Sequence, residues 1–197
     1  MRADIGQQQR YAHSVRVARI AELLARAHGE NTRRARLAGM LHDLARLYPA
    51  DRLLAECATR GISIDDFERQ HPVVLHARIG AELARERYGV TDEGVLSAIR
   101  AHTLGSPDMS RLDAVVFLAD ALEPGRTFDG REVLLRLARH DLDGAIRGVL
   151  ESSASYLRGR GLAVAPLTTA ALARYGAPGA DAIPPNGTRM EDHFCPT

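Results

Sequence analysis

The sequence predicts an all-α protein built as one domain. Ala, Leu, Arg and Glu, all of which favour helices, dominate its 197 residues, of which 45% are hydrophobic. Apolar residues recur at helical spacing over most of the chain, and no long stretch alternates between apolar and polar residues as a strand would. Trp is absent and aromatic residues make up 5%, so we expect an aliphatic core. A chain of this length suits a single domain.

Apolar spacing and the turn signals between apolar segments predict nine helices. Their expected ranges are 8–28, 32–47, 50–60, 73–88, 92–102, 110–123, 130–138, 141–159 and 168–175. The stretches "HGEN" and "YGVTDE" each end one helix and begin the next, with Thr91 as the expected N-cap. "GSPDMS" separates two further helices, and "EPG" ends the segment 110–123.

The second predicted helix has apolar residues on two sides. Large side chains lie on one face at Leu37, Met40, Leu41, Leu44, Leu47 and Tyr48, and small residues lie on the opposite flank at Ala35, Ala38, Gly39 and Ala45. Small residues let another helix pack closely, so this helix should be buried on more than one side. The adjacent His42 and Asp43 are therefore unusual, because a buried carboxylate is unfavourable unless it is paired or binds a metal.

Two other predicted helices carry a histidine on an inward-facing stripe. His13 belongs to an apolar stripe that continues through Val17, Ile20 and Leu24. Taken alone, such a histidine is more often a hydrogen-bonded core residue than a ligand. His76 begins the small-residue stripe of "HARIGAELA", where another backbone can approach.

The helices 92–102 and 110–123 also place polar residues after apolar ones. His102 continues the stripe of Val95 and Ile99, although a protonated histidine at a helix C-terminus would also have a structural role. Asp120 follows six apolar residues in "AVVFLAD". Its structural alternative is a buried salt bridge to an arginine such as Arg16.

Taken together, these residues predict a metal centre. Four histidines and two aspartates on five helices would otherwise need separate partners in an aliphatic core: His13, His42, Asp43, His76, His102 and Asp120. Imidazole with carboxylate suits iron, zinc or manganese, and the lack of cysteine ligands argues against a structural zinc site. Six ligands suit two ions that share a carboxylate, as in two-metal phosphoryl hydrolases. The other histidines are interpreted as non-ligands: His28, His71, His140 and His193.

Composition narrows the class of protein. The net charge is +1 without a basic block, so we expect no nucleic-acid partner. No signal peptide or membrane-length apolar run is evident, which predicts a cytoplasmic protein with no membrane partner. Cys57 and Cys195 show neither metal spacing nor a disulfide framework. Residues 1–175 are expected to form the domain, and residues 176–197 a Pro/Gly-rich disordered tail.

The ordered set His13, His42-Asp43 and Asp120 resembles the signature of the HD-domain superfamily of metal-dependent phosphohydrolases. The resemblance is closer to the YqeK-type symmetrical bis(5'-nucleosyl)-tetraphosphatases and covers about residues 8 to 175. The motifs that carry it are "RYAHSVRVA", "LAGMLHDLAR", "LHARIGAELA", "IRAHTLGSPDMS", "VFLADALEPGR" and "APLTTAALAR".

The resemblance implies an all-helical, usually dimeric bacterial enzyme with a di-iron centre that hydrolyses diadenosine tetraphosphate to two ADP. One metal would be held by His13, His42, Asp43 and Asp120, with Asp43 bridging, and the second would be completed by His76 and His102. The chain departs from the family at Arg46, where Lys is common, and at Tyr175, where Asn usually follows Arg. The first change keeps a charge for phosphate binding, and the second alters the C-terminal end of the pocket.

A hydroxide activated by the two metals would attack an inner phosphorus and expel ADP. Asp43 and Arg46 are the expected catalytic residues, and Arg46 and Arg126 would stabilise phosphate charge. Arg16 would contact either substrate or Asp120, and the resemblance places Thr103 and Gly105 along the substrate pocket. The alternatives are an HD phosphohydrolase for a nucleoside monophosphate, a cyclic dinucleotide or guanosine tetraphosphate, and a non-catalytic HD-scaffold binding module.

Overall fold

The computed structural model describes residues 8–176, in which helices alternate with turns and no strand occurs. The helices are α2 (Gln8–Ala27), α3 (Thr32–Leu41), α4 (Ala50–Thr59), α5 (Asp66–Gln70), the 3-10 helix η1 (Pro72–Leu75), α6 (His76–Tyr88), α7 (Glu93–Ala101), α8 (Arg111–Leu122), α9 (Arg131–Leu137), α10 (Leu142–Gly159) and α11 (Pro166–Tyr175). The predicted all-α class is confirmed. The predicted tail, apart from Gly176, lies outside the described residues together with His193 and Cys195.

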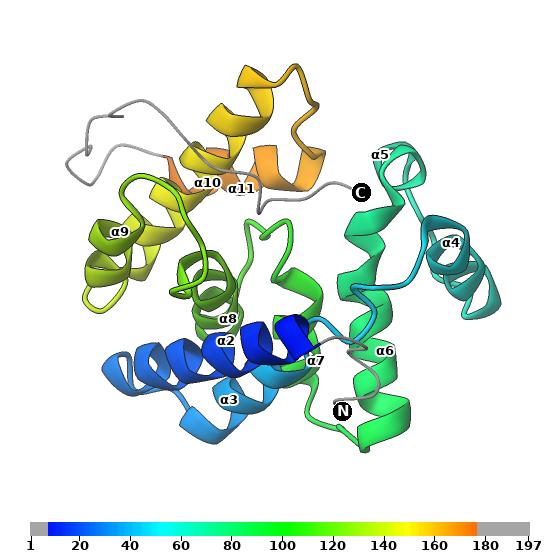
Figure 1. Ribbon diagram of the computed structural model, residues 1–197, viewed down its shortest axis with the longest axis horizontal. Helices are drawn as coiled ribbons and strands as arrows, with labels where there is room; N and C mark the ends of the chain where they lie inside the picture. Colours follow the sequence, from blue (N-terminus) through cyan, green and yellow to red (C-terminus); the bar gives the residue numbers. More distant parts are fainter. Residues whose placement is uncertain (1–7, 177–197) are drawn as a thin grey trace.

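Helix α8 is the centre of the bundle. Its residues from Leu112 to Ala119, and Leu122, are all buried. It packs against α2, α3, α7, α9 and α10. Figure 1 shows α2 and α3 together at one end of the molecule, α10 and α11 at the other, and α4 and α5 beyond α6. Because α8 packs against helices on several sides, its C-terminal end, which carries Asp120, lies in the middle of the fold. Within residues 8–176, no helix has the length and apolarity needed to span a membrane.

The predicted close approach to the second helix is confirmed at Gly39. A Cβ atom there would lie 2.9 Å from the Cα atom of Ala18 on α2, so glycine permits this helix crossing. The large-residue face was predicted wrongly in part, because Leu37 and Leu47 are 41% and 43% exposed. The small-residue flank is buried, with Gly39 against α2, and Leu41 and Leu44 of the large-residue face are buried as well, whereas Leu37 and Leu47 are not.

Several boundaries also differ from the predictions. The helix expected over 32–47 ends at Leu41, and tighter bonds follow, with the Leu44 amide donating to the Leu41 carbonyl and the Arg46 amide to the Asp43 carbonyl. A continuous helix would separate adjacent side chains by about 100°. His42 and Asp43 nevertheless lie within 3.4 Å of each other, Nε2 to Oδ2.

Other differences arise at capping positions. The N-cap of α7 is Asp92 instead of Thr91, because the Asp92 carboxylate accepts hydrogen bonds from the amides of Gly94 and Val95. Pro72 starts η1, so α6 begins only at His76, and α5 was not predicted at all.

Candidate metal centre

All six predicted ligands lie together in the structure. They come from α2, the turn after α3, the first residue of α6, the residue after α7 and the last turn of α8. All but Asp120 are buried, and the side chain of Asp120 is 16% exposed. Groups of imidazole nitrogens and carboxylate oxygens lie within 4.8 Å of one another in three overlapping sets: His13–His42–Asp43, His42–His102–Asp120 and Asp43–His76–His102.

Asp43 stands between two pairs of histidines. Its Oδ2 atom lies 3.6 Å from His13 Nε2 and 3.4 Å from His42 Nε2. Its Oδ1 atom lies 3.2 Å from His76 Nε2 and 3.7 Å from His102 Nε2. Each carboxylate oxygen thus faces a different pair. We call the two groups the His13 half (His13, His42, Asp43 and Asp120) and the His76 half (Asp43, His76 and His102).

The other ring nitrogen of each histidine is already engaged. The Nδ1 atoms of His42, His76 and His102 donate to the carbonyl oxygens three residues earlier, those of Gly39, Val73 and Ile99, at 2.6–2.8 Å. A carbonyl oxygen only accepts, so these Nδ1 atoms carry the proton. In the neutral ring Nε2 then presents a lone pair to the centre.

These lone pairs point at one another. His13 Nε2 lies 3.2 Å from His42 Nε2, and His76 Nε2 lies 3.1 Å from His102 Nε2. Facing lone pairs repel unless a cation lies between them. Two imidazole nitrogens bound to one ion at about 2.0–2.1 Å are themselves about 3.0–3.4 Å apart at ordinary coordination angles. The donor set and its spacing therefore fit a metal ion in each half.

Electrostatics keep the carboxylates ionised. Burial alone would raise the pKa of Asp43, but in the metal-free protein a proton on Nε2 of the neighbouring His42, His102 or His76, in the place that a metal ion would take, holds it well below its usual range. Burial likewise opposes ionisation of Asp120, whose pKa is held well below its usual range by Arg126 and His13. Burial lowers the pKa of His76 and so favours the neutral ring that a metal requires.

The sequence analysis missed two contributors, Glu123 and Arg10. Glu123 is 2% exposed, and its Oε1 atom lies 3.1 Å from His13 Nδ1. It was overlooked because it opens the turn "EPG", where a solvent-exposed carboxylate is ordinary. Arg10 donates from Nη1 to Asp43 Oδ2 at 2.8 Å. Its place one turn before His13 on α2 was the available signal.

Of the two contacts considered for Arg16, the alternative of a salt bridge with Asp120 is wrong. Asp120 Oδ1 accepts from Arg126 Nη2 at 2.5 Å, and Arg16 Nε donates to Glu123 Oε2 at 2.5 Å. Glu123 accepts hydrogen bonds from two of the three guanidinium nitrogens of Arg16, Nε and Nη2, so the arginine is directed to it.

Of the remaining predicted substrate residues, Thr103 lies beside the centre. The Thr103 hydroxyl lies 3.0 Å from His102 Nε2 and 3.3 Å from His76 Nε2, on the rim of the His76 half. Gly105 has a φ of 69°, a conformation that favours glycine, and packs near Phe117. Arg46 is half-buried three residues after Asp43.

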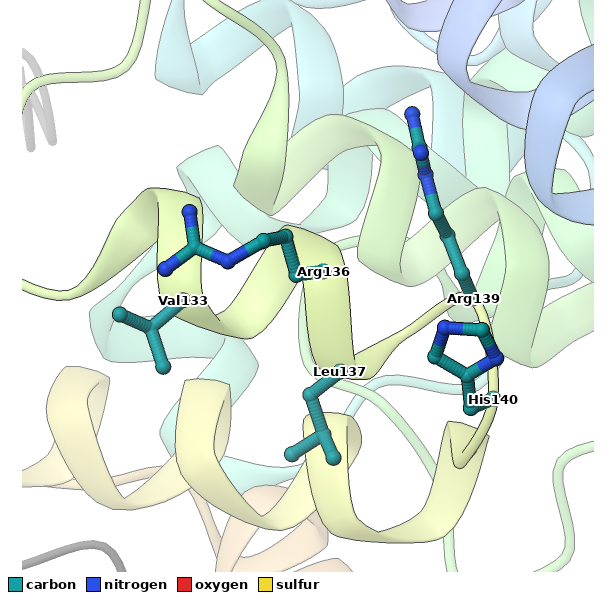
Figure 2. A pocket seen from close by; sticks show the side chains of 5 residues that line it. All are labelled: Val133, Arg136, Leu137, Arg139 and His140. Atoms are coloured by element: carbon teal, nitrogen blue, oxygen red, sulfur yellow. The ribbon is translucent and has the colours of Figure 1, made fainter.

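The three described histidines that were interpreted as non-ligands, His28, His71 and His140, lie elsewhere. His28 Nε2 bonds the carbonyl of Ala138 at 2.7 Å, and the ring of His71 packs on Phe67. His140 lines a shallow surface depression with Arg136 and Arg139 (Figure 2), which contains none of the six predicted ligands.

Comparison with known proteins places this geometry in a family. The family model described as "HD domain" matches residues 10–125, a range that runs from α2 through Gly125 and spans all six ligand candidates. The chain belongs to the HD domain family. HD domains bind divalent metal ions, in agreement with the clustered histidines and aspartates.

Individual relatives of this HD domain cover most of the chain. It is 36% identical over 163 residues to a symmetrical bis(5'-nucleosyl)-tetraphosphatase of Halalkalibacterium halodurans, covering 83% of this chain and 87% of that one. A protein of the same name from Bacillus subtilis is 33% identical, covering 82% and 86%. A crystal structure described as a predicted HD superfamily hydrolase involved in NAD metabolism, from Clostridium acetobutylicum, superposes with a TM-score of 0.85 at 32% identity, covering 89% and 93%.

Proposed function

We propose that this HD domain is a symmetrical bis(5'-nucleosyl)-tetraphosphatase that cleaves diadenosine tetraphosphate into two ADP. The observation that carries the proposal is the position of Asp43, whose two carboxylate oxygens each face a separate pair of histidines. A carboxylate shared in this way suits two ions held about 3.5–4 Å apart. The names of relatives that match most of this chain supply the substrate class.

We assign the first ion to the His13 half and the second to the His76 half. Two bound metal ions would lower the pKa of water from 15.7 to about 7 and neutralise charge on phosphoryl oxygens. The side chains of Arg46 and Arg126 add positive charge beside the ligands. Arg126 reaches Asp120 directly, which places its guanidinium next to the His13 half.

The substrate contacts in this proposal differ in kind. The Thr103 hydroxyl beside His76 and His102 can donate to a phosphoryl oxygen. Gly105 shapes the turn that follows Thr103 through its positive φ. The side chain of Arg16 is 38% exposed, so we propose that part of it is open to substrate while Nε holds Glu123.

The identity of the metals is part of the proposal. Iron is the ion that the family resemblance implies, and manganese or zinc would suit the same nitrogen and oxygen donors. Protein purified without oxygen should carry close to two transition-metal ions per chain. Folded protein that contains no metal and takes none up would contradict the proposal. A homodimer in the cytoplasm, with neither nucleic acid nor membrane as partner, stays a prediction, as does the domain range 1–175.

The reaction itself is tested by its products. Diadenosine tetraphosphate should yield ADP as the only nucleotide, because attack at an inner phosphorus releases ADP from both sides. AMP with ATP would indicate attack at an outer phosphorus and would contradict the proposal.

A substrate panel separates the alternatives. Hydrolysis of a nucleoside monophosphate, a cyclic dinucleotide or guanosine tetraphosphate, without hydrolysis of the dinucleoside tetraphosphate, would favour another HD phosphohydrolase. Binding without any turnover in the metal-loaded protein would favour a non-catalytic module.

A further inference from the structure

One of the four histidines of the candidate metal centre is held differently from the other three. His42, His76 and His102 each donate from Nδ1 to a main-chain carbonyl three residues earlier. His13 instead presents Nδ1 to the carboxylate of Glu123, which lies 110 residues further along the chain. The orientation of three rings is thus set by backbone, and the orientation of the fourth by a side chain.

Glu123 is itself held on several sides. Its Oε2 atom accepts from Arg16 Nε at 2.5 Å and from the amide of Gly125 at 2.6 Å. Its Oε1 atom accepts from Arg16 Nη2 at 3.3 Å in addition to facing His13. Arg16 is one turn beyond His13 on α2, so the helix that carries the histidine also carries the residue that holds its acceptor. The side chain of Glu123 is 2% exposed, and solvent does not compete for these bonds.

Gly125 makes the arrangement possible. A Cβ atom at this position would lie 2.6 Å from Arg16 Nη2 and 2.7 Å from Glu123 Oε1. A side chain at this position would therefore displace the ends of the Arg16 and Glu123 side chains from this arrangement.

An ionised acceptor at Nδ1 has two effects on an imidazole. It fixes the tautomer with the proton on Nδ1, which directs the Nε2 lone pair into the centre, and it makes Nε2 a stronger donor to a metal. His13 Nε2 points towards Asp120 Oδ1 at 3.1 Å and His42 Nε2 at 3.2 Å. Loss of such an acceptor typically weakens metal binding by about 10–100-fold.

We infer that Glu123, held by Arg16, is a positioning residue that sets metal affinity in the His13 half and leaves the His76 half unaffected. The selectivity follows because His76 and His102 take their orientation from main-chain carbonyls that Glu123 does not touch. The inference rests on the proposed function only in using its two-ion site.

The first measurement reports on His13 without any metal. Nitrogen-15 NMR of the histidine rings distinguishes the two tautomers, and wild-type His13 should carry its proton on Nδ1. In Glu123→Gln the amide can accept from His13 only by turning its NH2 group towards the donors of Arg16 and Gly125. His13 should therefore populate both tautomers in this variant, whereas the other three rings should not change.

The second measurement titrates the metal-free protein with Zn²⁺, which is diamagnetic and lets each ring report its own ion. Wild type should bind two ions. In Glu123→Gln the ion reported by His13 and His42 should bind at least tenfold more weakly, and the ion reported by His76 and His102 should stay within about threefold.

Two further variants provide controls. Asp113 is another buried carboxylate on α8, bonded to Ser97 and Ser110 away from the centre. Asp113→Asn should leave both zinc affinities unchanged. Arg16→Gln keeps Glu123 but removes part of its support, so it should weaken the same ion to a smaller extent.

The outcomes separate this inference from the proposed function. Unchanged His13 tautomers, equal weakening of both ions in Glu123→Gln, or the same loss in Asp113→Asn would overturn the inference. Loss of helical circular dichroism in both the Glu123 and Arg16 variants would make the pair a folding element and would also overturn it. If wild type binds two zinc ions and Glu123→Gln weakens only the ion reported by His13 and His42, but wild type hydrolyses no dinucleotide, only the proposed function is overturned.

Discussion

At the scale of single residues, Asp43 has the most exacting position, because its two oxygens face different pairs of histidines. Asp43→Asn keeps the volume but provides a neutral group with one good oxygen donor. We expect metal content and turnover to fall together, turnover by at least about 100-fold, because loss of a group that only orients a metal ligand already costs about 10–100-fold. The measurement is metal analysis beside activity, with thermal melting before and after addition of a chelator.

The competing explanation for Asp43 gives a different result. If Asp43 were only an ion-pair partner of Arg10, its substitution would leave a partly buried cation without a counter-charge. The loss would then appear as about 3–5 kcal/mol of stability that does not depend on metal. A chelator should destabilise wild type and have little further effect on the variant. Wild-type melting and activity that are insensitive to chelator would contradict the metal-centre interpretation.

Acid stability tests the environment of Glu123. Burial would raise the pKa of this carboxyl, but His13, Arg16 and the Gly125 amide lower it from 4.5 to about 2. A depressed pKa stabilises the fold above the unfolded value, and this contribution is lost as the pH falls from 4.5 towards 2. The difference corresponds to about 3 kcal/mol. Urea unfolding of metal-free wild type and Glu123→Gln should show a stability gap that narrows below pH 4.5. A gap that stays constant down to pH 3 would contradict this assignment.

The residues that could be predicted from sequence are those that violate a local pattern. His13 interrupts an apolar stripe, and Asp120 follows six apolar residues, so both stand out. Glu123 does not, because a carboxylate next to Pro124 in a turn has no expected burial. Only the tertiary structure, which brings α8 against α2, gives Glu123 its role. The same fact explains why Glu123 was not among the partners considered for Arg16.

At the scale of helices, the contact between α2 and α3 has almost no spare room at Gly39. Gly39→Ala should push α3 away from Ala18 and lower stability by about 1–3 kcal/mol. Because His42 bonds the Gly39 carbonyl, metal affinity should fall as well. The measurement is denaturant unfolding of the metal-free protein, followed by zinc titration.

Gly159→Ala is the matched control for this prediction. Gly159 ends α10, and a Cβ atom there would meet nothing within 4 Å. Its substitution should change stability by no more than about 0.5 kcal/mol. Equal effects of the two substitutions would show that general helix propensity, not the contact with α2, governs Gly39.

Helix positions were predictable where periodicity is strong, and less so where short-range bonds compete. The long helices α2, α6, α8 and α10 follow their apolar stripes. The segment after Leu41 keeps a helical pattern of residues yet forms turns, because a periodic pattern does not distinguish i+4 from i+3 hydrogen bonds. Helix α5 is short and held by the Asp65–Glu68 capping box, with no buried residue to reveal it.

At the scale of the whole molecule, the ligands tie together segments from α2 to α8, whereas none lies on α4, α5, α9, α10 or α11. At a free metal concentration 100 times the dissociation constant, each bound ion would add about 2.7 kcal/mol to the free energy of unfolding. We expect chelation to lower the melting temperature and added Zn²⁺ to restore it. Calorimetry of the same sample before and after metal removal is the measurement. Identical melting in both states would mean that the ions do not bridge these segments.

The spread of the ligands along the chain also has a consequence for biosynthesis. Translation proceeds from the N-terminus, so Asp43, His76 and His102 leave the ribosome before Asp120 and Glu123 do. The His76 half can therefore assemble on a nascent chain, while His13 still lacks two of its three carboxylate neighbours, Asp120 and Glu123. Newly made protein should therefore acquire its two ions in sequence. The ion of the His76 half should bind first, and the ion held by His13, the earliest ligand in the chain, should bind last.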